Sequence, residues 1–359
     1  MSSKVKISLA GAGLIGRRHI EVMQGAVNDM ELDSIVDPTE EGKAYAHSLG
    51  VKWFSSLKEM LNTAKPDGVI LATPNQVHVE NGLECIAAGC PILVEKPIAT
   101  TFEEAQQLIE AAELANVPVL VGHHRRHNHL IQKARQIIKD GELGQLTTVH
   151  ASCWFYKPEE YFAPEWRRKI GAGPILVNTI HDVDLLRYLC GDVESVQAIA
   201  SNNVRKFETE DTAAVLIKFK SGALGTLSVT DAVQSPWSWE MTSGENPDFS
   251  ATPESCYMIG GTKGSLSVPD IRLWKHESGG HWKSPISAKS FSKSNVDPLL
   301  SQINHFINVI KGSEEPLISA EEGMKSLCVV EAIQRSATSG EMVLLDEMLA
   351  KNKPLEKAV

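Results

Sequence analysis

The chain has 359 residues, of which 42% are hydrophobic and 22% charged, so it has the composition of a globular protein and the length of two domains. Its formal net charge of -10 argues against a nucleic-acid partner, because proteins that bind a phosphate backbone usually carry a basic face. No segment has the roughly 18 apolar residues that a membrane span needs, and no C-x-x-C spacing among the six cysteines indicates zinc or disulfides, so we expect a cytoplasmic protein that binds small molecules.

Short apolar runs alternate with helical patterns over the first part of the chain. Strands are expected at residues 5–10, 32–36, 68–72, 91–94 and 118–121, and helices at 16–27, 40–49, 57–63, 77–88 and 102–116. This alternation predicts an N-terminal Rossmann domain, which is a doubly wound parallel sheet with ligands at the carboxyl ends of its strands. We place this domain at residues 1–124.

The pattern changes in the remainder, residues 125–359, which we expect to form a second, α/β domain. Helices are expected at 130–140, 178–190, 297–311 and 320–339, and strands at 146–156, 195–204, 212–219, 224–232, 255–259 and 265–268. Short turns between successive strands indicate a large open, mainly antiparallel sheet. Segments 235–253 and 278–294 are rich in Gly, Ser and Pro, which predicts long loops that act as lids or contact loops.

The motif Gly11-Ala12-Gly13-Leu14-Ile15-Gly16 lies between the first predicted strand and the first predicted helix. Glycines at this spacing allow a tight turn and a close approach to a pyrophosphate, which the helix N-terminus attracts. Asp37 ends the second strand, where a carboxylate accepts the ribose hydroxyls of NAD and would repel the 2'-phosphate of NADP. Residues 38–41 supply no cation, so the sequence favours NAD, although an Asp before Pro38 is also a common turn residue.

Two side chains carry the chemistry that we expect beside the cofactor. Lys96 follows an apolar strand, and His181 lies on a predicted helix with Asp184 one turn later. Removing hydride from an alcohol requires a group that takes the hydroxyl proton and a donor near that oxygen, and His181 suits the first role and Lys96 the second. Each residue also has a purely structural interpretation: Lys96 as an ion-pair partner of Glu95, and His181 as a packed core residue.

Six motifs in order resemble the glucose-fructose oxidoreductase, inositol dehydrogenase and rhizopine-catabolism (Gfo/Idh/MocA) family, over essentially the whole chain. They are Gly11 to Gly16 with His19, Ala72-Thr73-Pro74-Asn75 with His78, Ala87-Ala88-Gly89 with Glu95-Lys96-Pro97, Gly122 with Arg125-Arg126 and Asn128, His181-Asp182-Val183-Asp184, and Gly260 to Ser265. The last is expected to be a hairpin turn and not a phosphate loop. The resemblance implies a Rossmann domain followed by a domain whose open sheet forms subunit contacts, and hence a homodimer or homotetramer.

The resemblance also implies roles for individual residues. Cofactor contacts are expected from Gly11, Gly13, Leu14, Ile15, Gly16, Asp37, Thr73, Pro74, Asn75, His78, Glu95 and Lys96. Substrate contacts are expected from Arg125, Arg126, Trp154, Tyr156, Trp166, Arg167, Asn178 and Asp184, with Lys96 and His181 as catalytic residues and a Lys96–Pro97 bond that tends to be cis in relatives. One position departs from the family, because many relatives carry Asp where this chain has Val177, and the adjacent Asn178 supplies no charge to activate His181.

Residues 123–129 contain four histidines, but an extended backbone would place them on opposite faces, so we predict no metal site. The sequence thus predicts an NAD-dependent dehydrogenase of a cyclic polyol, sugar or sugar derivative. One alternative is a dehydrogenase of a carboxylated cyclic dihydrodiol or sugar acid, which requires Arg125, Arg126, Arg167 and Arg168 to converge on a carboxylate. The other is a dinucleotide-binding sensor without turnover, which the presence of both Lys96 and His181 disfavours.

Overall fold

The computed structural model describes residues 4–26, 29–277, 280–292 and 296–351, and the chain divides into two compact units. The first unit comprises Met1–His127 and Asp297–Leu327, and the second comprises Asn128–Val296 and Cys328–Val359. Residues 297–327, which we expected in the second domain, therefore belong to the first. The reason is that their helix contributes apolar side chains to the core of the first sheet.

The first unit contains a six-stranded sheet in the order β3-β2-β1-β4-β5-β6. All its neighbouring strands are parallel, which confirms the predicted doubly wound sheet. The strands are β1 (Val5–Ala10), β2 (Met30–Val36), β3 (Lys52–Phe54), β4 (Gly68–Leu71), β5 (Ile92–Val94) and β6 (Val119–Val121). The strand order reverses between β1 and β4, and in such sheets the crevice at this switch point receives the ligand.

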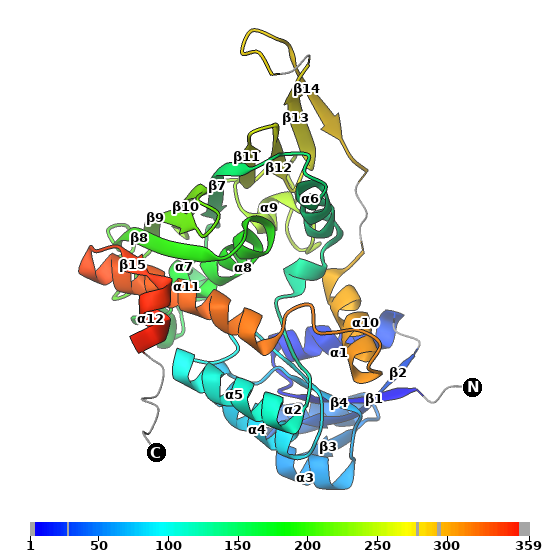
Figure 1. The fold of residues 1–359 in the computed structure, drawn as a ribbon. Coiled ribbons are helices and arrows are strands. Elements are labelled where there is room, and N and C mark those ends of the chain that lie inside the picture. The colour runs from blue at the N-terminus through cyan, green and yellow to red at the C-terminus, as the bar shows by residue number, and fades with distance from the viewer. Residues whose placement is uncertain (1–3, 27–28, 278–279, 293–295, 352–359) are drawn as a thin grey trace, which may run out of the picture. The chain divides into compact units, whose positions relative to one another are not determined.

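Helices cover both faces of this sheet (Figure 1). They are α1 (Leu14–Ala26), α2 (Glu40–Ser48), α3 (Leu57–Thr63), α4 (His78–Ala87), α5 (Phe102–Ala115) and α10 (Pro298–Ile310), with the short 3₁₀ turns η1 (Asn75–Val77) and η2 (His124–His127). Thr39, Ser56 and Thr101 cap helices by accepting a backbone N–H in the first turn. Helix α10 packs beside α1 and places Ile303 and Phe306, both fully buried, in the core of the sheet.

The second unit contains a nine-stranded sheet in the order β14-β13-β12-β11-β7-β10-β9-β8-β15. Its strands are β7 (Leu146–Trp154), β8 (Val193–Ser201), β9 (Thr212–Phe219), β10 (Leu224–Thr230), β11 (Tyr257–Gly261), β12 (Gly264–Val268), β13 (Arg272–His276), β14 (Ile286–Ser290) and β15 (Val343–Leu344). Only the pair β7–β10 is parallel, so the sheet is mixed and mainly antiparallel. Gly261 pairs with Gly264 across the predicted hairpin turn.

The prediction of a loop at 278–294 is wrong for residues 286–290, which form β14. Every residue of this strand is exposed, so its sequence lacks the apolar alternation that marks a half-buried strand. Residues 278–279 and 293–294 lie outside the described residues. The other predicted loop, 235–253, contains the short helix α9 (Trp239–Thr242).

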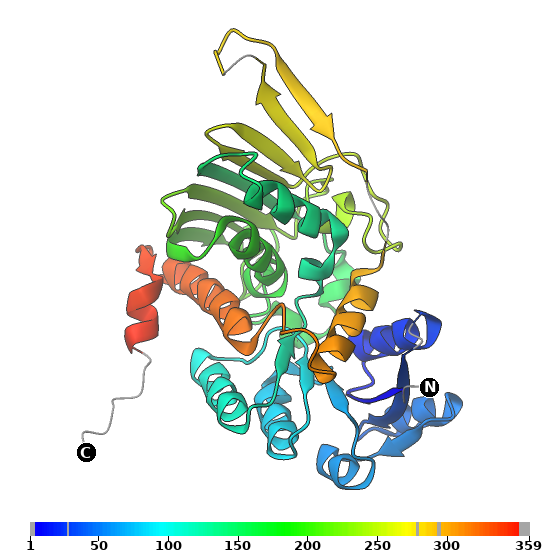
Figure 2. The ribbon, with the colours of Figure 1, turned by 45° about the vertical axis from the view of Figure 1, so that its right-hand side comes forward.

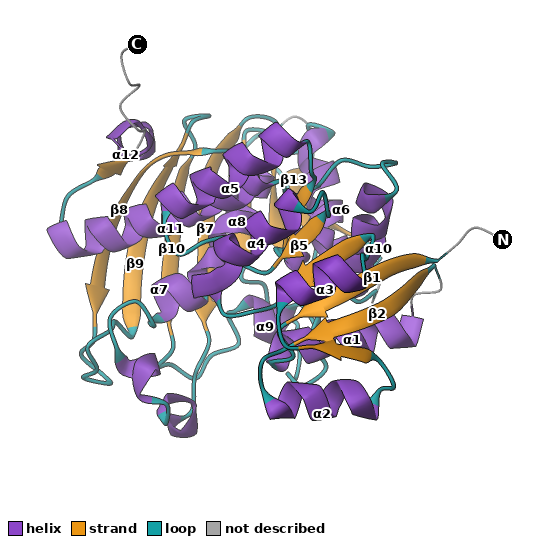
Figure 3. Cartoon of the chain, turned by 90° about the horizontal axis from the view of Figure 1, so that it is seen from below, coloured by secondary structure: helices purple, strands orange, loops and turns teal. Residues whose placement is uncertain are grey.

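Helix α8 (Thr179–Cys190) lies across one face of this sheet (Figure 3). The other helices of the unit are α6 (His129–Lys139), α7 (Pro174–Val177), α12 (Leu345–Lys351) and the 3₁₀ turns η3 (Glu159–Phe162) and η4 (Glu165–Arg168), while α11 (Ala320–Ser339) contains the boundary between the units. Alternate residues of the central strands β8, β9 and β10 are buried on the helix side. Figure 2 views the sheet from the helix side. The opposite side, here called the open face, exposes the apolar side chains Ile199, Leu216, Leu224 and Met258.

Within the described ranges, no helix combines the length and the apolar character that crossing a membrane requires.

Candidate active site

The candidate residues of the first unit gather at one edge of its sheet, because parallel strands end on the same side. Gly11 follows β1, Asp37 follows β2, Thr73 follows β4 and Glu95-Lys96 follow β5. These positions include both strands at the switch point. The structure therefore brings together, at the carboxyl edge, most of the residues for which the sequence predicts cofactor contact.

The three glycines of the first turn have different reasons to lack a side chain. Gly11 has φ +92°, and a Cβ there would lie 2.5 Å from the carbonyl oxygen of Ala72, while a Cβ on Gly16 would lie 1.9 Å from the oxygen of Gly11. The fold itself therefore excludes a side chain at both positions. A Cβ on Gly13 would meet no protein atom within 4 Å, and the next residue, Leu14, is 93% exposed. The space over Gly13 thus fits an external group such as a pyrophosphate, with the N-terminus of α1 beneath it.

Asp37 is buried and held in one orientation by the turn around it. Its Oδ2 accepts the backbone N–H of Ala12 at 2.8 Å, and its Oδ1 accepts the backbone N–H of Thr39 at 2.9 Å as well as the Thr39 hydroxyl. Burial raises the pKa of Asp37, but these hydrogen bonds outweigh it and keep the pKa below its ordinary value. The carboxylate is thus ionised, and its remaining lone pairs suit the hydroxyls of a ribose.

A cation that the sequence analysis did not identify lies close to Asp37. Arg17 of α1 donates to the carbonyl of Ala12 at 3.0 Å and to Glu41 at 2.7 Å, and its guanidinium lies 4.5 Å from the ring centre of Tyr45. Its charge contributes to the lowered pKa of Asp37. No signal in residues 38–41 indicates this arginine, because it reaches the site from the opposite end of the glycine turn.

The loop that follows β5 and carries Lys96 is held by the buried carboxylate of Glu95. Glu95 is 5% exposed, and its Oε1 accepts the Nε2–H of the fully buried His19 at 2.8 Å. Its Oε2 accepts the backbone N–H of Lys96 at 3.2 Å. The Lys96–Pro97 peptide bond is cis, as the resemblance implies, and Lys96 itself is only partly buried.

His78, at the start of α4, joins two loops of the edge. It is 1% exposed, and its Nε2 and Nδ1 each lie 2.8 Å from a carbonyl oxygen, that of Thr73 and that of Pro97 respectively. Asn81 adds a hydrogen bond to the Thr73 hydroxyl at 3.2 Å. His78 therefore acts on the backbone after β4 and β5, in addition to any contact that it makes with a cofactor.

The two arginines after β6 are both buried, Arg125 at 7% and Arg126 at 2% exposed. Arg126 forms an ion pair with Glu322 of α11 at 3.1 Å, within the first unit. Arg167, by contrast, belongs to the second unit, where it donates to the carbonyl of Tyr161 at 2.7 Å and lies 4.1 Å from the centre of that ring. Arg126 and Arg167 thus each have a partner inside their own unit.

In the second unit, α8 carries the predicted catalytic histidine. His181 is 9% exposed, and Asp184 follows it by one turn and is 1% exposed. Asn178, at the start of this helix, accepts the backbone N–H of His181 at 3.1 Å. The intervening Asp182 is fully buried and accepts the hydroxyl of Tyr257 on β11, so it fastens α8 to the sheet.

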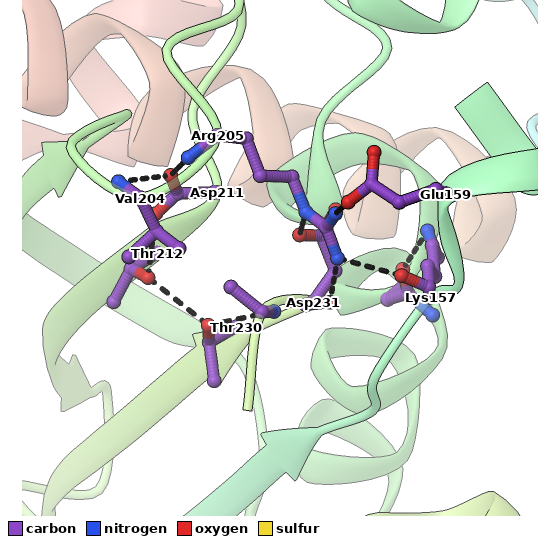
Figure 4. Close-up of polar contacts among 10 residues, drawn as sticks. Lys157, Glu159, Val204, Arg205, Asp211, Thr212, Thr230 and Asp231 are labelled. Carbon is purple, nitrogen blue, oxygen red and sulfur yellow. Dashed lines mark hydrogen bonds and ion pairs between the residues drawn. The ribbon is translucent and has the colours of Figure 1, made fainter. Parts of the chain in front are cut away.

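A lysine that the sequence did not single out lies against this helix. Lys157 is 5% exposed, and its Nζ donates to Asn178 Oδ1 at 2.7 Å and lies 4.7 Å from the ring centre of Tyr161. Figure 4 shows the network behind it, in which Arg205 donates to the carboxylate of Asp231 and to the carbonyl of Lys157, both at 2.7 Å. The structure therefore places a buried ammonium beside Asn178.

The aromatic residues expected at the substrate site lie in different surroundings. Trp154 belongs to the open face, opposite α8, where it lies edge-on to Trp237 with 5.3 Å between the ring centres. Tyr156 is 41% exposed and Trp166 60% exposed, with the Arg167 guanidinium 5.2 Å from the Trp166 ring centre. These placements leave Asn178, His181 and Asp184 as the candidate cluster of the second unit.

In the part of the chain that the structure describes, no three His, Cys, Asp or Glu side chains come close enough to hold a metal ion.

Comparison with known proteins bears on both halves of the chain. A family model described as an oxidoreductase family with an NAD-binding Rossmann fold matches residues 5–123, and one described as the GFO/IDH/MocA C-terminal domain matches residues 131–267. The chain is 27% identical to a 1,5-anhydro-D-fructose reductase of Ensifer adhaerens, covering 93% of this chain and 96% of the relative. It is 24% identical to a myo-inositol 2-dehydrogenase of Thermotoga maritima, covering 96% and 100%.

Among solved structures, the WlbA dehydrogenase of Bordetella pertussis, in complex with NADH and UDP-GlcNAcA, has a TM-score of 0.75 to this chain. The two are 29% identical, and the match covers 95% of this chain and 98% of the other. The likeness thus extends across both units of the chain.

Proposed function

The chain belongs to the Gfo/Idh/MocA family of NAD-dependent oxidoreductases, and on this premise we propose that it transfers hydride between NAD and a secondary alcohol of a cyclic polyol, sugar or sugar derivative. The observation that carries the proposal is the carboxyl edge of the first sheet. There, open space over Gly13, an ionised Asp37 and the loop that carries Lys96 follow strands β1, β2 and β5, along the edge that contains the switch point. Relatives named as an anhydrofructose reductase and an inositol dehydrogenase support a cyclic, hydroxyl-rich substrate.

Lys96 and His181 divide the proton handling in this proposal. The nicotinamide, when bound, accepts or supplies the hydride. The Lys96 ammonium donates a hydrogen bond to the substrate oxygen and stabilises the negative charge that develops on it, and His181 takes the hydroxyl proton during oxidation.

The test is turnover with a panel of inositols, aldoses and anhydro sugars, followed by the absorbance of reduced nicotinamide. With the best substrate, Lys96→Met and His181→Asn should each lower kcat by about 100-fold or more, while calorimetry shows NAD binding retained. The matched controls, exposed Lys58→Met and exposed His47→Asn, should keep wild-type turnover. Wild-type turnover in Lys96→Met would remove this lysine from the mechanism, and NAD binding without turnover on any substrate would favour a sensor.

A carboxylated sugar or cyclic diol is the second candidate substrate, and Lys157 favours it. Its buried ammonium lies at the start of the helix that carries His181, where a substrate carboxylate would gain a strong charge-assisted hydrogen bond. The panel therefore includes sugar acids paired with their neutral counterparts. Lys157→Met should raise KM for the acids by about tenfold or more and leave the neutral sugars less affected, whereas equal effects on both would reject this candidate.

We propose in addition that copies of the chain associate through the open face as a homodimer or homotetramer. Ile199, Leu216, Leu224 and Met258 expose apolar surface on four strands of the sheet, and such patches commonly mark protein contacts. We also propose a cytoplasmic location, because all six cysteines are unpaired and buried, which fits a reducing compartment.

A further inference from the structure

Glu95 occupies a position where a carboxylate is difficult to bury. The residue is 5% exposed at the carboxyl end of β5, and water therefore does little to stabilise its charge. The protein backbone leaves space for the side chain only because residue 122 is glycine, since a Cβ there would lie 2.9 Å from Glu95 Cδ. The carboxylate is thus enclosed between its own strand end and that of the neighbouring β6.

Two hydrogen-bond donors and a further histidine lie around this carboxylate. His19 of α1 donates to Oε1 at 2.8 Å, the backbone N–H of Lys96 donates to Oε2 at 3.2 Å, and His124 of η2 lies close enough to act on its charge. Burial raises the pKa of Glu95, but the His19 hydrogen bond and the charges of His19, His124 and Lys96 lower it to about 2. Glu95 is therefore an anion at any pH at which the protein works.

The attraction between Glu95 and Lys96 acts on both partners. A carboxylate whose ionised form is favoured by Lys96 favours the ammonium form of Lys96 by the same free energy. From the other side, His78 of α4 holds the carbonyl of Pro97 at 2.8 Å, so the loop is fastened on both flanks of the lysine. Lys96 itself is partly buried, a setting that by itself would favour the neutral amine.

We infer that Glu95, oriented by His19, is the positioning residue of Lys96: it fixes the lysine's backbone and supplies the counter-charge that keeps the side chain an ammonium hydrogen-bond donor. This inference rests on the donor role proposed for Lys96. It separates two functions at this edge of the sheet, since Glu95 acts on the lysine and has no contact with the reacting atoms in the proposed reaction.

The experiment measures the titration of the Lys96 amine directly in the full-length protein. Lysines are labelled by reductive ¹³C-methylation, the Lys96 signal is assigned by its loss in Lys96→Arg, and NMR spectra are recorded against pH. Glu95→Gln should move the Lys96 titration midpoint down by about one pH unit or more, the usual effect of losing an adjacent opposite charge. Glu95→Asp keeps the charge and should retain most of the wild-type midpoint.

The control is Asp33→Asn, which removes another buried carboxylate of the same sheet, one that pairs with Lys52 at 3.0 Å. It should leave Lys96 unchanged. An unchanged Lys96 midpoint in a folded Glu95→Gln protein would overturn the inference. If the Glu95→Gln protein does not fold, the test uses the wild-type protein alone, in which the titration midpoints of Lys96 and of exposed Lys58 are compared. A Lys96 midpoint that lies a pH unit or more below that of Lys58 would show that no counter-charge acts on Lys96.

Turnover assays on the same proteins separate this inference from the proposed function. With an active substrate, the pH dependence of kcat should shift together with the Lys96 midpoint, while NAD affinity stays near that of the wild type. A shifted midpoint with no turnover on any substrate would support the role of Glu95 and reject the proposed reaction. An unchanged Lys96 midpoint in Glu95→Gln, together with normal turnover, would support the proposed reaction and reject the role of Glu95.

Discussion

Among single residues, the glycines of the first turn are the most informative, because two serve the fold and one leaves space for a ligand. Gly11→Ala should lower the free energy of unfolding by about 1–3 kcal/mol, since its φ of +92° and the nearby Ala72 carbonyl oppose a side chain. Gly13→Ala should change it by less than about 0.5 kcal/mol, yet weaken NAD binding by tenfold or more. Urea unfolding and calorimetric titration measure the two quantities, and unaltered NAD affinity in Gly13→Ala would show that the cofactor does not cross this turn.

The buried carboxylate at position 95 has a consequence for acid stability. Its pKa of about 2 in the folded protein lies below the ordinary Glu value of 4.5, so its ionised form stabilises the fold above pH 4.5, and this contribution is lost as the pH falls toward 2. The contribution is roughly 3 kcal/mol. Glu95→Gln should therefore show a shallower loss of stability between pH 5 and pH 2 in urea unfolding series, and parallel curves for the two proteins would contradict this.

At the scale of elements, α4 connects the loops after β4 and β5 through a single side chain. His78→Phe preserves the ring volume but leaves the carbonyls of Thr73 and Pro97 without their contacts, so the free energy of unfolding should fall by about 1–3 kcal/mol. NAD affinity should fall with it, because both loops border the proposed site. His47→Phe, at an exposed position of α2, provides the control for adding an aromatic ring. Equal stability of the two variants would mean that His78 holds neither loop.

The elements also show which features a sequence can predict. Strand–helix alternation, helix caps and glycine spacing are local, and they predicted the parallel sheet and the positions of Gly11, Gly16 and Asp37 at its edge. Strands β3, β13, β14 and β15 were missed. Strands β3 and β13 each have a single buried residue, β14 has none, and β15 has only two residues. The ion pair of His19 with Glu95 joins residues that are 76 positions apart in the sequence. The hydrogen bond of Lys157 to Asn178 likewise joins a loop residue to the start of a helix. Such pairs follow from tertiary packing, which no local pattern specifies.

For the whole molecule, the open face of the second sheet determines the expected state of assembly. Leu216→Glu places a charge at the centre of this apolar surface, so it should convert an oligomer into monomers while the monomer remains folded. Light scattering coupled to size exclusion measures the mass, and circular dichroism checks the fold. Val204→Glu introduces the same charge at a position that is 67% exposed in a loop, and it should leave the mass unchanged. An identical mass for wild type and Leu216→Glu would exclude this face as the contact.

Residues 297–327 lie late in the sequence but belong to the first unit, and this affects the order in which the two units can be completed during synthesis. Helix α10 supplies Ile303 and Phe306 to a core most of whose members are encoded before residue 128. During synthesis from the N-terminus, the nucleotide-binding half therefore waits for a late segment, while strands β7 to β14 of the other half have already left the ribosome. The half that is encoded first is thus completed only after residues 128–296 of the other half have been made, and until then the apolar surface that α10 covers in the folded protein stays uncovered.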